Sequence, residues 1–313
     1  MLLNEILKIK YPIVQGAMAN IATAEFASAV SNAGALGVIA TGAMNPQQVE
    51  EAVARCRSLT DKPFGVNVMM MNHHSPEIFE VLYRLKPAVV TTGAGNPGPY
   101  MAKLKEAGIF VIPVVPTVSL AIRMQQAGAD MVIVEGTEAG GHVGEMTTMA
   151  LVPQAVDSLN IPVIAAGGIG DGRGFASALM LGAIGVQMGT LLLASEECPI
   201  HENYKNAVLK AKDSDTVVTG RSVSAPVRIM RNPMSQEYLR LEKEGATKDE
   251  LEKLTLGSLR KAVFDGDVKN GSVMMGQIAG MIKEVRPLKQ IFEDIILDAK
   301  QQLPKLQGKL DQL

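Results

Sequence analysis

The chain has 313 residues, of which 47% are hydrophobic, so it can bury one large core or two smaller ones. Thirty basic and 32 acidic side chains leave a formal charge of −2, which gives no overall field to attract nucleic acid or an anionic membrane. Cys56 and Cys198 match neither a metal-ligand spacing nor a disulfide framework, so we expect no metal site and two buried thiols. No basic leader opens the chain, and no run of about 18 uncharged apolar residues occurs, so we expect a cytoplasmic protein.

Short β-rich runs alternate with helical patterns over the first 190 residues. Strands are predicted at Pro12–Gln15, Leu36–Ala40, Phe64–Met69, Ala88–Thr92, Phe110–Val115, Met131–Glu135, Val163–Ala166 and Val186–Met188. Helices between them are predicted at Thr23–Asn32, Pro46–Arg57, Pro76–Leu85, Pro99–Ala107, Val118–Ala127, Thr148–Leu159 and Gly172–Leu181. Eight such strands with intervening helices fit a closed TIM (β/α)8 barrel better than an open doubly wound sheet.

An internal repeat supports the barrel. The segments 32–40, 126–134 and 180–188 each carry a helix that ends at Gly and a buried strand that follows at once. The repeated unit is therefore one helix and one strand.

The pattern changes after Thr190. Residues 195–267 are polar and helix-forming, with helices predicted at Tyr204–Lys212, Ser235–Glu244 and Lys248–Phe264 and no clear strand. The glycine-rich apolar segment 271–280 then predicts a return to the barrel mouth before a terminal helix from about Pro287. We therefore predict a barrel of residues 1–194 and 268–313 and an inserted helical subdomain, residues 195–267, that acts as a lid. Tyr204, Arg228 and Met230 are expected to face the mouth.

The sixth predicted strand runs into a glycine-rich loop that presents His142. Loops at the carboxyl ends of barrel strands build active sites, so this histidine is the candidate catalytic residue. Gly140, Gly141 and Gly144 would let the backbone approach a flat ligand closely. The alternative is structural: the loop needs glycine in any case, and the histidine caps a helix.

Two later strand ends predict a phosphate site. Gly167 and Gly168 follow the seventh strand, and Gly189 and Thr190 follow the eighth. In barrels these two loops often bind phosphate through backbone N–H groups. A tight turn at Gly167 and Gly168 is the alternative.

Other predicted strand ends carry small or polar residues: Gly16, Ala17, Met18, Thr41, Asn67 and Thr91. Such groups can hydrogen-bond the edge of an isoalloxazine ring without adding charge, although many of them could equally form turns. Met69–Met71 could line an acyl channel or simply fill the core.

At this point the motifs resemble a known family. The segments 15–18, 62–67, 91–97, 138–142, 165–169 and 187–190 are similar to those of the FMN-dependent enoyl-acyl-carrier-protein reductase II enzymes (FabK type), close relatives of the nitronate monooxygenases, once called 2-nitropropane dioxygenases. The resemblance covers nearly the whole chain. Segments 91–97, 112–116 and 266–273 favour the reductase branch. The chain departs from many relatives at Ala17–Asn20 and at Leu191, where an arginine is common.

The resemblance implies an enzyme of bacterial fatty acid synthesis that binds FMN. NADH or NADPH supplies the hydride, which passes through the flavin to the 2,3 double bond of an enoyl thioester on acyl carrier protein. His142 would donate a proton or a hydrogen bond to the developing enolate. Cofactor contacts are also expected from Glu135, Ala166, Gln187, Met188, Gly276 and Gln277, and a homodimer and a monovalent cation are further expectations.

Three supporting roles are left open. Glu135 and Glu138 either orient His142 or serve as solvated or capping carboxylates, and Thr147 either orients the loop or is the N-cap of a helix.

Two other functions remain open at this stage. One is a nitronate monooxygenase that oxidises alkyl nitronates with O₂, and the other is a flavin-free phosphate-binding barrel such as an isomerase or lyase. A yellow purified protein would exclude the flavin-free barrel.

Overall fold

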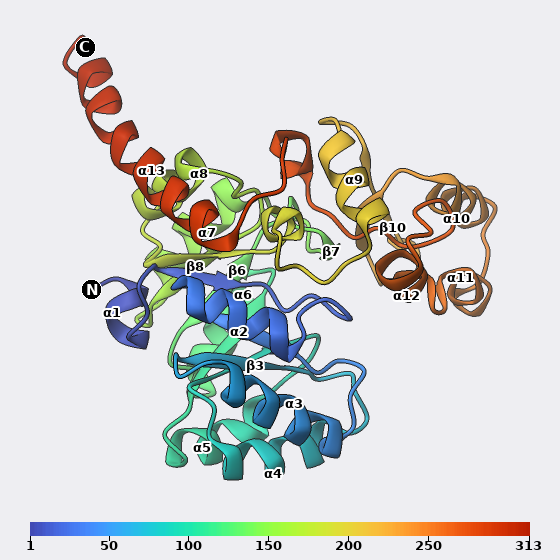
Figure 1. Ribbon diagram of the computed structural model, residues 1–313, viewed down its shortest axis with the longest axis horizontal. Coiled ribbons are helices and arrows are strands. Elements are labelled where there is room, and N and C mark those ends of the chain that lie inside the picture. The colour runs from blue at the N-terminus through green and yellow to red at the C-terminus, as the bar shows by residue number, and fades with distance from the viewer.

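A ring of eight parallel strands forms the centre of the protein, which we describe from a computed structural model of residues 1–313 (Figure 1). The order around the ring is β1-β9-β8-β6-β5-β4-β3-β2, and a bridge between Val14 and Leu36 joins the two ends. The predicted TIM-like barrel is confirmed. Its strands are β1 (Ile13–Gln15), β2 (Gly37–Ala40), β3 (Phe64–Met69), β4 (Val89–Gly93), β5 (Phe110–Val115), β6 (Val132–Glu135), β8 (Val163–Ala166) and β9 (Gly185–Met188).

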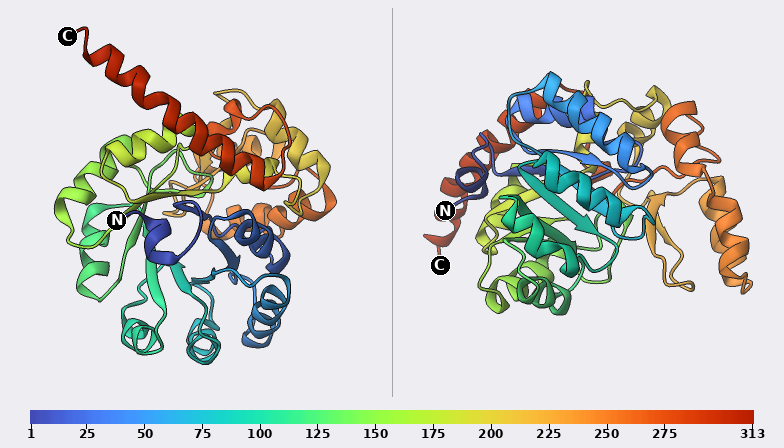
Figure 2. Two further views of the ribbon diagram at one scale, coloured as in Figure 1. Left: turned by 60° about the vertical axis from the view of Figure 1, so that its left-hand side comes forward. Right: turned by 90° about the horizontal axis from the view of Figure 1, so that it is seen from below.

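Helices alternate with these strands and surround them (Figure 2, left). Thr23, Asn45, Thr117 and Asp171 each accept a hydrogen bond from a backbone N–H of the first turn, which explains where four of the helices begin. All seven predicted helices are present with ends that differ by at most two residues: α2 (Ala24–Ala33), α3 (Pro46–Leu59), α4 (Ser75–Leu85), α5 (Gly98–Glu106), α6 (Val118–Gln126), α7 (Thr148–Ser158) and α8 (Gly172–Met180).

The barrel has an inner and an outer core. Side chains such as Val38, Val89 and Ile133 fill the interior, and Leu3 and Leu7 of α1 (Leu3–Leu7) belong to the same apolar cluster. The larger outer cluster lies between strands and helices and includes both cysteines, Cys56 and Cys198, as buried free thiols. Burial raises the pKa of each thiol to about 12, so both behave as small apolar residues.

The inserted segment lies to one side of the barrel (Figure 1, yellow to orange), and its secondary structure differs from the prediction in two respects. It contains a hairpin, β10 (Thr216–Thr219) and β11 (Val227–Met230), which pairs with β7 (Gly141–His142) into a three-stranded sheet, so the expectation of no strands was wrong. The long predicted helix is broken at Gly257, which adopts a positive φ of 72°. The helical elements are α9 (Glu202–Lys210), α10 (Pro233–Lys243), α11 (Lys248–Thr255), α12 (Ser258–Arg260) and the π-helical turn η2 (Lys261–Asp265).

The chain leaves and re-enters the barrel through two short 3₁₀ helices, η1 (Thr190–Ala194) and η3 (Gln277–Met281), before the terminal helix α13 (Leu288–Leu310). This helix packs against α8 so closely that a Cβ on Gly172 would lie 2.4 Å from the backbone nitrogen of Ala299. Its last turns extend beyond the barrel (Figures 1 and 2). None of the helices combines the length and apolar character needed to cross a membrane.

Candidate active site

A cavity of about 640 Å³ opens at the carboxyl ends of the barrel strands. This volume lies within the ~300–1,000 Å³ typical of ligand sites. Most of the residues predicted to bind the cofactor or catalyse line it: Gly16, Ala17, Met18, Asn67, Glu135, Gly140, Gly141, His142, Ala166, Gly167, Gly168, Gln187, Met188, Gly189 and Thr190. The fold thus brings together predicted residues from five strand ends, those of β1, β3, β6, β8 and β9.

Thr41 and Thr91 do not line the cavity but lie behind Asn67. The Thr41 hydroxyl donates to the Asn67 carbonyl oxygen at 2.7 Å, and the Asn67 amide donates to the Thr91 hydroxyl at 3.0 Å. Both threonines are buried. They therefore fix the rotamer and backbone of Asn67, whose amide oxygen remains available at the wall.

Gly276 and Gln277 also lie outside the cavity wall. The Gly276 N–H donates to the Thr190 hydroxyl at 2.8 Å, and the Gln277 N–H donates to the Glu138 carbonyl oxygen at 2.9 Å. A Cβ on Gly276 would lie 2.6 Å from that same carbonyl oxygen, so this position requires glycine for close backbone contact. The returning segment thus ties the β6 loop to the end of β9.

His142 lies on β7 and faces the cavity. Its side chain is solvent-accessible and makes no hydrogen bond to any other group of the protein. Desolvation by the surrounding protein lowers the pKa of the imidazole below its ordinary value. The imidazole is therefore largely neutral, and because neither ring nitrogen is hydrogen-bonded within the protein, it can contact a ligand directly. Neither Glu135 nor Glu138 orients it through a hydrogen bond.

Glu135 ends β6 and contributes a buried carboxyl group to the cavity. Its one side-chain hydrogen bond is from the Gln187 amide, with Nε2 3.4 Å from Oε2. Burial without a cationic partner raises the pKa of this carboxyl to about 7. Glu135 is therefore protonated in a large fraction of molecules at neutral pH and can donate a hydrogen bond into the cavity.

Glu138 caps α7. Its carboxylate accepts hydrogen bonds from the Thr148 backbone N–H at 3.0 Å and from the Thr148 hydroxyl at 3.1 Å. Thr147 occupies the N-cap position of this helix by its backbone, but its side chain makes no capping hydrogen bond. Of the two roles left open for Glu138, the structure therefore shows the capping role. Thr147 is the N-cap of α7 through its backbone alone.

The predicted phosphate end consists of backbone donors. Gly167 and Gly168 adopt positive φ angles of 92° and 73°, and the N–H groups of Gly168, Gly189 and Thr190 donate to no acceptor within the protein. Free N–H groups from two adjacent loops suit an anion such as a phosphate. Apart from His142, the cavity wall holds only three ionisable residues, Glu135, Glu138 and Lys248. A cavity of this size, with walls that are mostly apolar or uncharged and with free backbone N–H groups at one end, fits FMN.

The insert contributes wall residues that the sequence did not identify. Val223, Ser224, Ala225, Pro226, Lys248 and Leu259 line the cavity. Tyr204, Arg228 and Met230, which were expected to face the mouth, do not line it: Tyr204 is fully buried, with its hydroxyl on the Met274 carbonyl oxygen at 2.7 Å. Six methionines also line the cavity, which favours the acyl-channel interpretation of the methionine-rich composition: Met18, Met69, Met71, Met124, Met188 and Met274.

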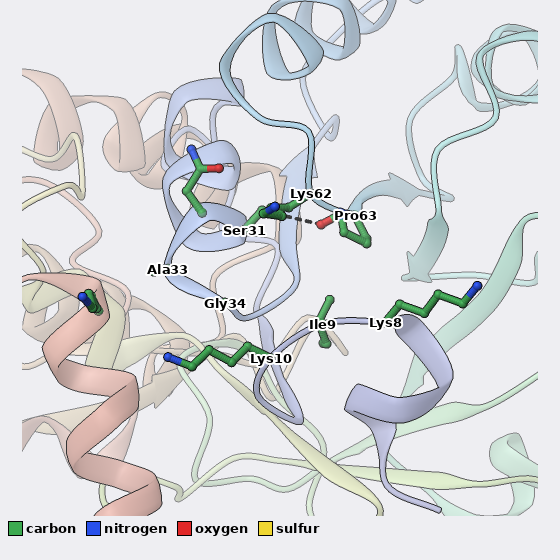
Figure 3. A pocket seen from close by; sticks show the side chains of 10 residues that line it. Lys8, Ile9, Lys10, Ser31, Ala33, Gly34, Lys62 and Pro63 are labelled. Carbon is green, nitrogen blue, oxygen red and sulfur yellow. Dashed lines mark hydrogen bonds between the residues drawn. The ribbon is translucent and has the colours of Figure 1, made fainter.

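A second, smaller cavity of about 200 Å³ lies at the amino ends of the strands (Figure 3). Lysines surround it, and the Ser31 hydroxyl beside it donates to the Pro63 carbonyl oxygen at 2.9 Å. It contains no acid, histidine or thiol. The chemistry therefore belongs to the larger cavity.

Comparison with known proteins agrees with this geometry. The profile of the nitronate monooxygenase family matches residues 1–84 and 76–298. The structure of FabK from Thermotoga maritima superposes with a TM-score of 0.95 at 48% identity and covers 98% of both chains. A 5-hydroxy-7a-methyl-1-oxo-octahydro-1H-indene-4-carboxyl-CoA dehydrogenase of Mycobacterium tuberculosis is 33% identical over 95% of each chain. A probable nitronate monooxygenase of Staphylococcus saprophyticus is 32% identical over 95% of this chain and 96% of its own. The chain is a FabK-like member of the nitronate monooxygenase family of flavin-dependent oxidoreductases.

Proposed function

We propose that the protein is an FMN-dependent enoyl-acyl-carrier-protein reductase that uses NADH or NADPH to reduce the 2,3 double bond of enoyl thioesters. The observation that carries this proposal is the 48% identity to Thermotoga maritima FabK over 98% of the chain, combined with a cavity that presents His142. The relative from Mycobacterium tuberculosis, named as a carboxyl-CoA dehydrogenase, adds support for a thioester substrate.

The cofactor site follows from the wall residues. The free N–H groups of Gly168, Gly189 and Thr190 would hold the phosphate of FMN, and Asn67, Glu135 and Gln187 would hydrogen-bond the polar edge of its ring. When bound there, FMN supplies the hydride transfer between the nicotinamide and the enoyl carbon. Riboflavin lacks the phosphate and should therefore bind more weakly than FMN.

His142 is the residue positioned to act on the substrate. Hydride addition at the β-carbon leaves negative charge on the thioester oxygen and the α-carbon. An imidazole that faces the cavity and is free of protein partners can donate a hydrogen bond or a proton to this charge. The apolar wall formed by methionines and by Val223, Pro226 and Leu259 of the insert would hold the acyl chain.

The deciding experiment is an anaerobic assay of NAD(P)H oxidation by the FMN-loaded protein. Oxidation that accelerates on addition of crotonyl or longer enoyl thioesters, with the saturated thioester as product, supports the proposal.

The second candidate, nitronate monooxygenase, is favoured by the family match and the staphylococcal relative. It predicts no acceleration by enoyl thioesters and, in air, oxygen consumption with an alkyl nitronate. The same assay with NADH, NADPH and monovalent cations, together with measurement of mass in solution, tests the nucleotide preference, the cation response and the expected homodimer.

A further inference from the structure

His142 is held in place through its backbone alone, because its side chain has no hydrogen-bond partner within the protein. Whatever fixes the loop that carries it therefore fixes the imidazole. The loop closes at its base, where the Thr137 N–H donates to the Met146 carbonyl oxygen at 2.7 Å. Between these two residues the chain has no helix, and glycine occupies positions 140, 141 and 144, so the loop needs external support.

The Gln277 N–H supports the start of this loop through the Glu138 carbonyl oxygen, and the part that carries His142 is supported by β11 of the insert. His142 pairs with Val227 and Gly141 pairs with Arg228 in an antiparallel register, and the Val143 N–H donates to the Pro226 carbonyl oxygen at 3.1 Å. The insert hairpin and the histidine loop thus form one sheet. A freely opening lid would have to break this pairing each time, which argues against independent motion of the hairpin.

Arg228 reinforces this sheet with its side chain. The residue is only 7% exposed, Nε donates to the Thr137 carbonyl oxygen at 3.0 Å, and Nη1 donates to the Thr216 hydroxyl at 3.0 Å. It therefore joins the base of the histidine loop to both strands of the hairpin. No carboxylate lies within ion-pair distance of it, and desolvation lowers the pKa of the guanidinium in spite of the nearby charge of Glu138. A buried cation of this kind is costly unless its hydrogen bonds are well made.

We infer that Arg228 is a positioning residue for His142: its guanidinium locks the 137–146 loop against the β10–β11 hairpin and so sets where the imidazole lies over the cavity. The inference rests on the proposed function for the role of His142. It assigns the hairpin a task beyond covering the mouth, because the hairpin becomes the scaffold of the reacting group.

The test compares Arg228→Met and Arg228→Lys with the wild type. Arg231→Met is the matched control, because Arg231 lies one residue beyond β11, is exposed and makes no side-chain hydrogen bond or ion pair. Three quantities are measured: FMN affinity, kcat and KM for an enoyl thioester, and amide hydrogen exchange of residues 137–146 by mass spectrometry.

For Arg228→Met we expect kcat to fall by about 10- to 100-fold, because small displacements of a reacting group cost that much. FMN affinity and KM should stay close to wild type, and exchange in the loop should become faster. Arg228→Lys can reach only one of the two acceptors at a time and should be intermediate, and Arg231→Met should match the wild type.

A wild-type kcat for Arg228→Met, unchanged exchange in the loop, or a loss of activity that simply follows loss of FMN would each overturn the inference. If Arg228→Met does not fold, Thr216→Val replaces it, because this change removes only the acceptor on the hairpin side. The inference is then overturned if both Thr216→Val and Arg228→Lys show a wild-type kcat and unchanged exchange in the loop. Should the wild type fail to reduce enoyl thioesters, the proposed function fails, while the exchange measurement still tests the positioning role.

Discussion

The Gln187 amide and the Glu135 carboxyl group meet across strand β8, with Nε2 3.4 Å from Oε2. Glu135 lies on β6 and Gln187 on β9, and β8 runs between these two strands, with Ala166 paired to both residues. The pair therefore joins three strand ends on the floor of the cavity. At this distance the amide N–H donates only a weak hydrogen bond, so it offsets little of the cost of ionising the buried carboxyl group.

This environment makes the stability of the FMN-free protein depend on pH. The pKa of Glu135 rises from an ordinary value of 4.5 to about 7. Between these values the folded state holds a proton that the unfolded state has lost, so stability falls as pH rises from 4.5 to 7. This contribution is about 3 kcal/mol. Glu135→Gln should remove it, and denaturant unfolding at pH 5 and pH 8 should then differ less than in the wild type. An unchanged difference would show that Glu135 is ionised in the folded protein.

Glu138 and Thr147 offer a paired test of the α7 cap. Glu138→Ala leaves the Thr148 N–H without its carboxylate and should lower the free energy of unfolding by about 1 kcal/mol. Thr147→Ala should have little effect, because that side chain makes no capping hydrogen bond. Chemical denaturation of the two variants decides. Equal losses would mean that the Thr147 side chain contributes as much to the cap as the Glu138 carboxylate.

The barrel could be predicted from the sequence because its signals are local. Each strand is a β-rich run, and β2, β5, β6 and β9 follow a helix end at Gly, as in Met180–Met188. Most of the cavity residues lie at or directly after the ends of strands. The ends of the elements differ by one or two residues because terminal turns depend on caps such as Thr23, which precedes the first helical residue of α2.

The insert sheet could not be predicted in this way. Thr216–Thr219 and Val227–Met230 are runs of four residues within polar sequence, and one of them pairs with His142, which is 85 residues away from Val227 in the chain. Long-range pairing of this kind leaves no local pattern. For the same reason Thr41 and Thr91 were expected at the cofactor, although they lie behind Asn67.

The insert wall should affect long substrates selectively. Leu259 lines the cavity, whereas Leu256 is 84% exposed and does not. Leu259→Ala removes apolar contact from the acyl chain and should raise KM for long enoyl thioesters by about fivefold. Crotonyl thioester and FMN should bind as in the wild type, and Leu256→Ala should change neither constant. Loss of FMN with an unchanged KM would place this wall beside the cofactor instead.

His142 should reveal its role through the pH dependence of kcat. Desolvation holds its pKa below the ordinary value of 6.5, so the protonated form is abundant only in mildly acidic solution. If the imidazolium donates the proton to the α-carbon, kcat falls as pH rises through this lowered pKa.

His142→Ala should keep the fold and FMN, because the side chain has no partner within the protein, yet lose about 10²- to 10⁴-fold in enoyl reduction. His142→Asn should retain more activity through a hydrogen bond, with a flat profile over the same range. NAD(P)H oxidation by an artificial acceptor controls for effects on the first half-reaction and should change little in either variant. Wild-type turnover of enoyl thioesters by His142→Ala would assign the histidine to structure, and a wild-type kcat that instead rises with pH would assign it to hydrogen bonding as a neutral imidazole.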